Sequence, residues 1–342
     1  MRQLNIIAPT IKTGGGKELL LYLVEYVQKE YPEVQVTLFA NNAICNEIQT
    51  SNIKIIQVNR IVDVIKLHGK PLSNALYFGN LPPYRKTKNS AVFFHNRYLL
   101  LSFKEVCSLP NNNIINKFKD IIRQIYIKLF IKNVSFVACQ NKTVQKQFIT
   151  KYGYKNVKVM PFFRVCPKPR SQMEKNFDFC YISIAHPHKN HLNLLKALEL
   201  LALDGLALSI ALTIEKNRSD LIEKIEKINE IGNVKIENFG VVSKHEVCKI
   251  YKKSRCLIFP STSESFGLPL VEASLLGLDI IASDLPFTFE VIEPTDTFDP
   301  GSFEDIAETI RKYLKNSKSA SQKKSTSKVN NNIEKLIESV MR

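Results

Sequence analysis

Short apolar runs alternate with amphipathic stretches along most of the chain. The first run, L-N-I-I-A-P, is followed by a helical pattern from Lys17 to Glu30 and then by V-Q-V-T-L-F-A. Later apolar runs in the same half are A-L-Y-F-G, A-V-F-F-H and S-F-V-A-C. Runs of this kind between amphipathic helices are typical of parallel sheets covered by helices on both faces. The first half therefore predicts an α/β fold.

A proline-containing break separates this array from a second one of about the same size. Pro161, Pro167 and Pro169 fit a linker better than the interior of an element. After them the alternation resumes, with apolar runs at 179–184, 207–214, 233–236 and 256–259 and a last run, D-I-I-A-S. Two Rossmann-like β/α/β domains predict a cleft between them, with ligands beyond the carboxyl ends of the strands.

The predicted domain boundaries follow from these patterns. Residues 1–165 are predicted to form an N-terminal Rossmann-like domain, and residues 166–315 a C-terminal one. Residues 316–332 are a polar, low-complexity tract that we interpret as a linker. The chain ends in a short amphipathic helix within 333–342, which can pack back on the first domain.

Charge and cysteine content restrict the class of protein. The 342 residues include 48 Lys and Arg against 32 Asp and Glu, a net charge of +16. Such an excess favours polyanions or an anionic membrane face, although solubility alone is an alternative. The seven cysteines contain no C-x-x-C pair, which predicts buried thiols in a reducing compartment without zinc or disulfides. No run resembles a signal peptide or a spanning helix, so we expect a cytoplasmic protein.

A glycine-rich segment, T-G-G-G-K-E, lies between the first strand and the first helix at residues 13–18. Glycines allow close backbone approach, and amides at a helix start suit an anion. The segment is not a Walker A motif, because Ile11 takes the first glycine position and Glu18 follows the lysine. It is not a dinucleotide fingerprint either, since no glycine stands three residues beyond Gly16. The segment is therefore interpreted as a loop at the cleft edge whose glycines let a ligand approach the backbone. The alternative is a tight turn without a binding role.

A second polar segment, Y-I-S-I-A-H-P-H-K-N-H, follows the first strand of the second array at residues 181–191. His186, His188 and His191 suggest a metal site, but the segment lacks a carboxylate ligand and the usual zinc spacing. A lysine beside a helix start suits phosphate better. We predict that Lys189 contacts phosphate; a metal site and a plain polar turn remain the alternatives.

The third segment, F-P-S-T-S-E-S-F-G-L-P-L-V-E at 259–272, carries two carboxylates. Pro269 suits the first turn of a helix that ends near Gly277, so the amides of residues 265–268 are expected to face the cleft. Glu272, one turn into that helix, suits the two hydroxyls of a ribose, and Glu264 the hydroxyls of a transferred group. In the alternative, Glu264 is a helix N-terminal charge and Glu272 a solvated surface residue.

Taken together, these segments resemble a known family. E-S-F-G-L-P-L-V-E is similar to the E-x7-E signature of the retaining glycosyltransferases of family 4 (glycosyl transferases group 1), which have the GT-B architecture. N-F-G-V-V-S-K-H-E-V-C-K-I-Y-K-K-S-R-C-L-I-F-P-S (238–261) and G-L-D-I-I-A-S-D-L-P (277–286) look like the flanks of that signature. S-I-A-H-P-H-K-N-H-L-N-L-L-K-A-L resembles the family's diphosphate loop, and T-G-G-G its N-terminal glycine loop. The resemblance is strong over residues 178–314 and weaker before them.

The resemblance implies that residues 1–165 are the acceptor-side domain and residues 166–315 the nucleotide-sugar-binding domain. It also implies roles for individual residues. Glu264, His95 and Lys189 are implied as the catalytic set, with His95 touching the sugar from the end of A-V-F-F-H-N-R. The residues implied to bind the donor are Gly15, Gly16, His186, Lys189, Ser265, Phe266, Gly267, Leu268 and Glu272. One position departs from the family, because Ile184 replaces the arginine common five residues before the diphosphate lysine. A second positive charge on the diphosphate, beside Lys189, must then come from His186 or Arg164, or it is absent.

The implied reaction is transfer of a sugar from a nucleotide-diphosphate sugar to a saccharide acceptor, with retention at the anomeric carbon. In this front-face reaction the leaving diphosphate takes the acceptor's proton, and Glu264 orients the sugar. No D-x-D occurs, so we expect no metal and no other cofactor. The family suggests a lipid-linked acceptor in bacterial surface polysaccharide biosynthesis, such as O-antigen, capsule or exopolysaccharide. A nonhydrolysing sugar-nucleotide epimerase and an inactive GT-B scaffold are the alternatives.

Residues 114–132 form a basic amphipathic helix in this interpretation. Its apolar stripe consists of Ile114, Phe118, Ile121, Ile122, Ile125 and Leu129, flanked by Lys117, Lys119, Arg123, Lys128 and Lys132. Such a helix suits anionic lipid, and we expect peripheral association with the inner face of the cytoplasmic membrane. An ordinary domain helix is the alternative. A nucleic-acid partner is not expected, because the basic residues are scattered and match no recognised module.

Overall fold

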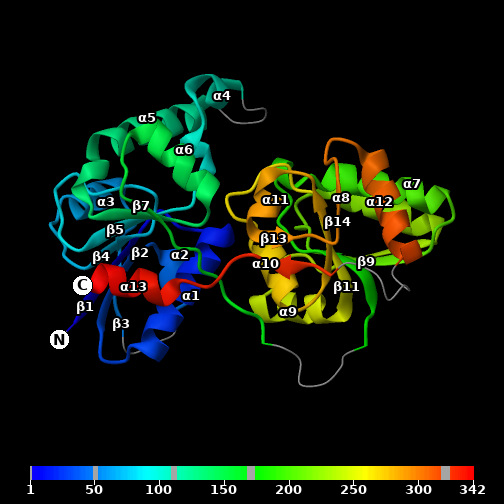
Figure 1. The fold of residues 1–342 in the computed structure, drawn as a ribbon, viewed down its shortest axis with the longest axis horizontal. Helices are drawn as coiled ribbons and strands as arrows, with labels where there is room; N and C mark the ends of the chain where they lie inside the picture. Colours follow the sequence, from blue (N-terminus) through cyan, green and yellow to red (C-terminus); the bar gives the residue numbers. More distant parts are fainter. Residues whose placement is uncertain (1, 49–52, 109–113, 168–173, 317–323) are drawn as a thin grey trace. The chain divides into compact units, whose positions relative to one another are not determined.

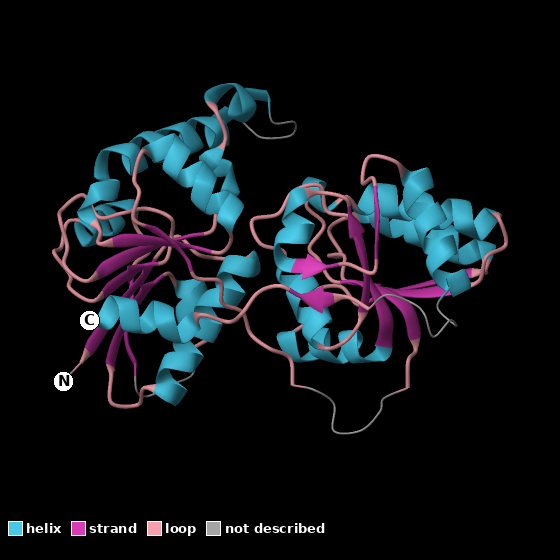
Figure 2. Ribbon diagram, in the orientation of Figure 1, coloured by secondary structure: helices cyan, strands magenta, loops and turns pink. Residues whose placement is uncertain are grey.

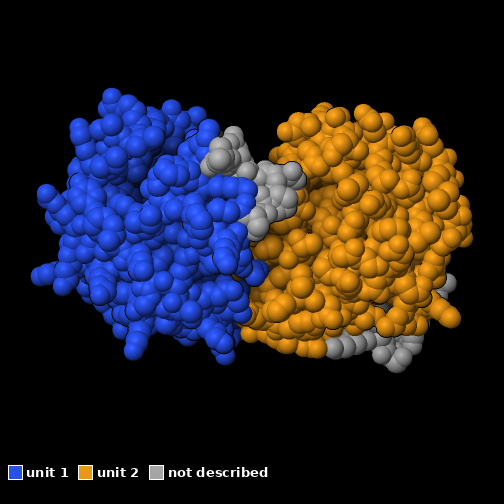
Figure 3. Space-filling view, turned by 90° about the horizontal axis from the view of Figure 1, so that it is seen from above, with its two compact units in different colours: residues 1–164, 330–342 blue, residues 165–329 orange. Residues whose placement is uncertain are grey.

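The structure is a computed structural model that describes residues 2–48, 53–108, 114–167, 174–316 and 324–342. It divides into two compact units (Figure 3). Unit 1 contains residues 1–164 and 330–342, and unit 2 contains residues 165–329. Pro169 of the expected proline linker and residues 317–323 of the expected polar linker lie outside the described residues.

Unit 1 is built on a seven-stranded parallel sheet with the order β3-β2-β1-β4-β5-β6-β7 (Figure 1). Strands β4, β5 and β6 are buried throughout, because helices cover both faces of the sheet. The strands are β1 (Gln3–Ala8), β2 (Gln35–Ala40), β3 (Ile53–Gln57), β4 (Ala75–Tyr77), β5 (Ser90–Phe94), β6 (Phe136–Cys139) and β7 (Val157–Val159).

Helices from distant parts of the sequence cover the two faces of this sheet (Figure 2). Side chains of α3, α5 and α6 pack on one face, where Leu67, Ile127 and Phe148 join the core. Helices α1 and α13 lie on the other face, and Asn332 N donates to Pro161 O (2.8 Å) at the start of α13. The helices are α1 (Gly14–Glu30), α2 (Asn42–Cys45), α3 (Ile61–His68), α4 (Phe103–Ser108), α5 (Ile114–Phe130), α6 (Lys142–Tyr152) and α13 (Ile333–Met341), with 3-10 turns η1 (Arg97–Leu100) and η2 (Ile131–Asn133).

Unit 2 repeats this plan with a six-stranded parallel sheet of order β10-β9-β8-β11-β12-β14. Helices α7, α8 and α12 pack together on one face, and α9, α10 and α11 cover the other (Figure 1). The strands are β8 (Phe177–Tyr181), β9 (Leu208–Leu212), β10 (Val234–Asn238), β11 (Ser254–Phe259), β12 (Asp279–Ser283) and β14 (Asp296–Phe298). The helices are α7 (His191–Leu203), α8 (Ser219–Ile231), α9 (Lys244–Lys253), α10 (Leu268–Leu275), α11 (Pro286–Val291) and α12 (Phe303–Asn316), with the 3-10 turn η3 (Pro187–Lys189). The prediction of two Rossmann-like units is confirmed.

Each sheet has one point where the strand order reverses. In unit 1 this point lies between β1 and β4, and in unit 2 between β8 and β11. Loops that leave the carboxyl ends of two such strands diverge to opposite faces, and the crevice between them is where open α/β sheets bind ligands. The glycine segment follows β1, and the segments with Lys189 and Glu264 follow β8 and β11.

Part of the segment that we interpreted as a linker packs on unit 2 instead. Within 316–332, strand β15 (Thr326–Ser327) pairs antiparallel with β13 (Ile292–Glu293). Nearby, Lys324 donates to the buried Asp279 (2.9 Å). Polar composition gave no sign of this pairing, because backbone hydrogen bonds need no apolar side chains.

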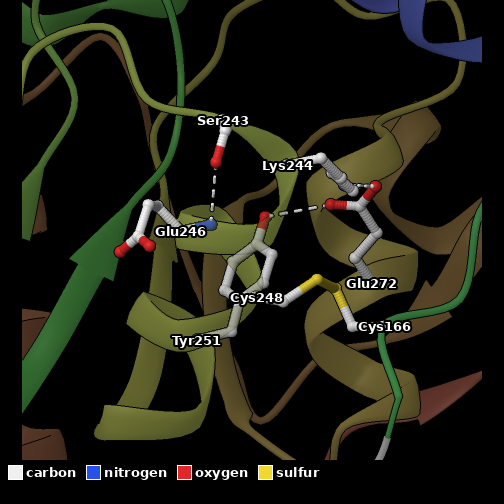
Figure 4. Close-up of a disulfide and its surroundings, with 7 residues drawn as sticks. All are labelled: Cys166, Ser243, Lys244, Glu246, Cys248, Tyr251 and Glu272. Carbon is white, nitrogen blue, oxygen red and sulfur yellow. Dashed lines mark hydrogen bonds and ion pairs between the residues drawn. A yellow bond between two sulfur atoms is a disulfide. The ribbon is translucent and has the colours of Figure 1, made fainter. Parts of the chain in front are cut away.

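The expectation of free cysteines is wrong for two of them. Cys166 and Cys248 form a disulfide although 82 residues separate them in the sequence (Figure 4). Local spacing carries no sign of a pair that meets only through the fold. The free cysteines among the described residues are Cys45, Cys107, Cys139, Cys180 and Cys256.

Candidate functional site

Two loops are joined at the strand-order reversal of unit 2. The first loop leads from β8 through η3 into α7, and the second from β11 into α10. Thr262 N donates to His188 O (2.8 Å), and Asn190 Nδ2 donates to Pro260 O (3.1 Å). These bonds hold the predicted phosphate loop and the predicted sugar loop side by side.

Lys189 and Glu264, one from each loop, form an ion pair. Lys189 Nζ lies 2.6 Å from Glu264 Oε1, and only 16% of the lysine side chain and 10% of the glutamate side chain are exposed. Ser261 Oγ donates to the same carboxylate oxygen (2.7 Å) and is fully buried. Poor access of water strengthens electrostatic interactions at this position. The sequence indicated the two charged residues, but it did not indicate their pairing or the role of Ser261.

The three histidines of the β8–α7 loop occupy different environments. His186 is exposed, and its ring stacks on His188 with centroids 5.9 Å apart. Burial, and then the neighbouring Lys189, lower the pKa of His188 to about 4. His191 is buried against the Tyr181 ring at 4.7 Å, and burial lowers its pKa to about 3. Both rings are therefore neutral at pH 7. In the described part of the chain, no three or more His, Cys, Asp or Glu side chains gather so as to hold a metal ion.

The Glu272 carboxylate lies inside unit 2 and is not a solvated surface group. Gly267 has φ of 83°, a conformation that favours glycine, and it is the N-cap of α10, which has Pro269 in its first turn. Glu272, one turn further, is 6% exposed. It is ion-paired with Lys244, and Tyr251 Oη donates to its Oε2 at 3.3 Å (Figure 4). Neither partner was predictable from the sequence.

The other residues of the β11–α10 loop that were predicted to bind the donor differ in exposure. Phe266 has its side chain buried (2% exposed), Ser265 is partly exposed, and Leu268 is the first residue of α10. Phe266 can therefore contact a donor only through its main-chain atoms.

In unit 1 the glycine segment lies against the candidate histidine. A Cβ built at Gly16 would lie 3.0 Å from His95 Nε2, so a side chain there would displace the ring. Gly15 and Gly16 are in the first turn of α1, which begins at Gly14. Asn80 Oδ1 accepts from the backbone amides of His95 (2.7 Å) and Asn96 (2.9 Å), a bridge the sequence did not reveal. Burial lowers the pKa of His95 to about 4, so its ring is neutral at pH 7.

The structure shows a cation next to the phosphate loop that the sequence analysis missed. Arg218 donates to the carbonyl oxygen of Ala185, inside that loop, and pairs with Asp220 (2.7 Å). Arg164, one of the expected candidates for a second cation, instead pairs with Glu25 (2.5 Å) in unit 1. Ile184 supplies no charge, so Arg218 is the stronger candidate within unit 2.

Within the apolar stripe predicted on α5, Phe118, Ile122, Ile125 and Leu129 are exposed, and Ile121 is half-buried. Ile127 faces the core, whereas Phe118 is 63% exposed and Leu129 is 66% exposed. We call the exposed residues Ile115, Phe118, Ile122, Ile125 and Leu129 the α5 apolar face. No helix in the described ranges is long and apolar enough to cross a membrane.

Sequence comparison finds a family that is similar to most of unit 2. Residues 167–333 match the family described as Glycosyl transferases group 1. This segment, just under half of the chain, is therefore similar to the glycosyl transferases group 1 domain. The Escherichia coli serotype-specific mannosyltransferase WbdA is 30% identical over 139 residues, which are 40% of this chain and 17% of that protein. The O-antigen chain mannosyltransferase RfbU of Salmonella typhimurium (strain LT2) is 26% identical over 180 residues, 50% of this chain and 49% of that protein. The chain thus spans half or less of these relatives.

Solved structures share the fold at low sequence identity. Anabaena Alr3699/HepE, solved in complex with UDP and glucose, has a TM-score of 0.66 at 15% identity and covers 100% of this chain and 96% of its own. Sucrose-phosphate synthase from Thermosynechococcus elongatus has a TM-score of 0.68 at 16% identity, covering 99% of this chain and 94% of its own. The predicted GT-B fold class is confirmed.

Proposed function

We propose that the protein is a retaining glycosyltransferase of family 4 that moves a sugar from a nucleotide-diphosphate sugar to a saccharide acceptor. The observation that carries this proposal is the Lys189–Glu264 pair at the strand-order reversal of unit 2. Lys189 supplies a cation for the leaving diphosphate, and Glu264 supplies a carboxylate for the sugar hydroxyls. The two groups lie side by side, as they must to bind the two sides of the sugar–phosphate bond that breaks. The match of residues 167–333 to glycosyl transferases group 1 supports the same reaction class.

In the proposed reaction each residue has a distinct role. The Lys189 ammonium, with Arg218 and His186 nearby, offsets charge that develops on the leaving diphosphate. Glu264, fixed by Ser261, orients the donor sugar and is not a covalent nucleophile. The acceptor hydroxyl attacks the anomeric carbon from the same face, the bond to the diphosphate oxygen breaks, and that diphosphate takes the hydroxyl proton. No metal ion takes part in this proposal.

The other implied contacts complete the donor site. Glu272 holds the ribose hydroxyls, and backbone of residues 265–268 contacts the sugar and phosphate. His95, neutral at pH 7, contacts the sugar through a ring nitrogen, and Gly16 leaves room for its ring. Gly15 is proposed to contact the donor through its backbone. Because two relatives of the chain are named mannosyltransferases, a mannosyl donor is our first candidate.

We further propose a lipid-linked acceptor in bacterial surface polysaccharide biosynthesis, reached by peripheral association with the inner face of the cytoplasmic membrane. Support comes from the α5 apolar face, which is exposed and bordered by the exposed Lys119, Lys128 and Lys132. Apolar side chains rimmed by lysines suit an anionic bilayer. The named function of RfbU in O-antigen chains agrees with this setting.

A panel of donors tests the proposal. Thermal shift and calorimetry with UDP- and GDP-linked sugars, GDP-mannose included, should reveal one selectively bound donor. Lys189→Ala should abolish its binding, whereas Lys196→Ala, which removes an exposed lysine from α7, should not. Absence of binding by any nucleotide sugar to the wild-type protein would refute the proposal.

The rival activities have different products. An epimerase would convert the bound nucleotide sugar into its epimer without an acceptor, which chromatography of the nucleotide sugars detects. An inactive scaffold would bind the donor and never release nucleoside diphosphate. Formation of a glycoside whose anomeric configuration matches the donor, measured by NMR, would exclude both.

A further inference from the structure

Three residues on one face of α9 point toward Glu272 and its surroundings (Figure 4). Ser243 Oγ accepts from Glu246 N (3.3 Å) and so begins the helix, which places Lys244 in its first turn. Lys244, Cys248 and Tyr251 are spaced i, i+4 and i+7, the spacing that puts side chains on one helix face. Cys248 forms a disulfide with Cys166, so this face of α9 is covalently linked to the segment that precedes β8.

Two of these side chains hold the Glu272 carboxylate at its two oxygens. Lys244 Nζ is ion-paired with Oε1, and Tyr251 Oη donates to Oε2. Glu272 is 6% exposed and Tyr251 is fully buried, whereas 21% of the Lys244 side chain remains exposed. A carboxylate in this setting needs a compensating cation and hydrogen-bond donors to stay charged.

From this arrangement we infer that Lys244 is a positioning residue for nucleotide binding: it fixes the charge and direction of Glu272, so that the carboxylate is ready to accept the ribose hydroxyls. The inference rests on the proposed function, because it concerns the nucleoside end of the same donor site. Lys244 acts through Glu272 and has no part in the sugar transfer itself. Its loss should therefore weaken nucleotide binding and leave the chemical step nearly unchanged.

The test compares three full-length variants with wild type. Lys244→Met keeps the length of the side chain and removes the charge, and Lys244→Arg restores a cation. Lys249→Met, on the same helix, breaks the exposed pair with Glu246 and is the matched control. Calorimetry gives the Kd for UDP, GDP and inorganic diphosphate, kinetics gives KM and kcat for the donor, and a melting curve gives Tm.

The expected result is selective for the nucleoside part of the ligand. Lys244→Met should raise the Kd for the preferred nucleoside diphosphate, and the KM for the donor, about tenfold or more. The Kd for inorganic diphosphate should stay within about twofold of wild type, and so should kcat. Lys244→Arg should recover most of the affinity, and Lys249→Met should behave as wild type.

Other outcomes overturn the inference in distinguishable ways. A lower Tm with unchanged Kd values would show that the pair only supports the fold. Equal weakening of inorganic diphosphate would assign Lys244 to the phosphates themselves. If wild type binds no nucleotide, the proposed function fails and the inference with it; if wild type binds and Lys244→Met binds equally well, only the inference fails.

Discussion

At the scale of single residues, both candidate carboxylates of unit 2 are held against a lysine with little access to water. Glu264 pairs with Lys189 and Glu272 pairs with Lys244, and none of the four side chains is more than 21% exposed. Bringing charged groups out of water is costly, so such pairs add little net stability, but removal of one partner leaves an uncompensated charge. Substitutions that keep shape and hydrogen bonding are therefore the informative ones.

Replacement of Glu264 by glutamine separates charge from shape. Glu264→Gln keeps an oxygen for Ser261 and removes the negative charge that the proposed orientation of the donor sugar needs. We expect kcat/KM for transfer to fall about 100-fold or more, with Tm changed by only a few degrees. Steady-state assays of nucleoside diphosphate release measure the effect, and Glu246→Gln on the exposed surface of α9 is the control. Near wild-type turnover by Glu264→Gln would contradict the assignment.

The residue types of the site were predictable, and their partners were not. Lys189 and Glu264 each follow a strand and precede a helix, a local pattern that the sequence displays. Their contact depends on β8 and β11 being neighbours in the sheet, which is a property of strand order. Ser261, Lys244 and Tyr251 belong to common residue types in unremarkable positions, so only their spatial contacts reveal them.

At the scale of elements, the helix over 114–130 was predictable, but the face it turns to the core was not. Ile127 faces the sheet and Ile131, just beyond the helix, is also buried, so the longer stripe with Phe118 and Leu129 is left exposed. Both faces of the helix are apolar in part, and periodicity alone does not choose between them. The five exposed residues of the α5 apolar face lie on one side of a single helix and are not scattered singly over the surface. Grouping of this kind supports a role in an interaction.

Polar substitution on the α5 apolar face tests that role. The double variant Phe118→Ser, Leu129→Ser removes two large exposed side chains, and we expect it to bind vesicles of anionic lipid at least about fivefold more weakly than wild type. Co-sedimentation with anionic and with neutral vesicles measures the change. Leu203→Ser, at an exposed leucine of α7 in unit 2, is the control. Wild-type binding that does not distinguish anionic from neutral vesicles would reject this surface as a membrane contact.

At the scale of the whole molecule, both units use the same β/α alternation, and this explains why the fold class could be predicted from the sequence. Strands covered on both faces, such as β5, read as continuous apolar runs. Contacts between distant segments were not predictable. The Cys166–Cys248 bond joins positions 82 residues apart, and the β13–β15 pair joins positions 33 and 35 residues apart. Neither has a local pattern, since each forms only after the sheets have brought its partners together.

Both units also contain histidines that burial keeps neutral, which predicts a pH-dependent stability. The pKa values are lowered to about 4 for His95 in unit 1 and to about 4 and 3 for His188 and His191 in unit 2. An unfolded chain binds these protons near pH 6.5. Below that pH the unfolded state binds more protons at these histidines than the native state does. Their contribution to the free energy of unfolding is therefore fully present above about pH 6.5 and is lost as the pH falls towards 4. Melting temperatures should therefore be lower at pH 5.5 than at pH 7.5.

His191 offers the sharpest test of that cause, because it is only 3% exposed and its ring lies against Tyr181. His191→Phe keeps an aromatic ring at this position and removes the proton-binding site, so the loss of Tm between pH 7.5 and 5.5 should shrink. His245→Phe, at an exposed position of α9, should leave the loss unchanged. Most carboxylates remain ionised at pH 5.5, so they contribute little in this window. If His191→Phe loses as much Tm as wild type, burial of this ring is not a source of the pH dependence.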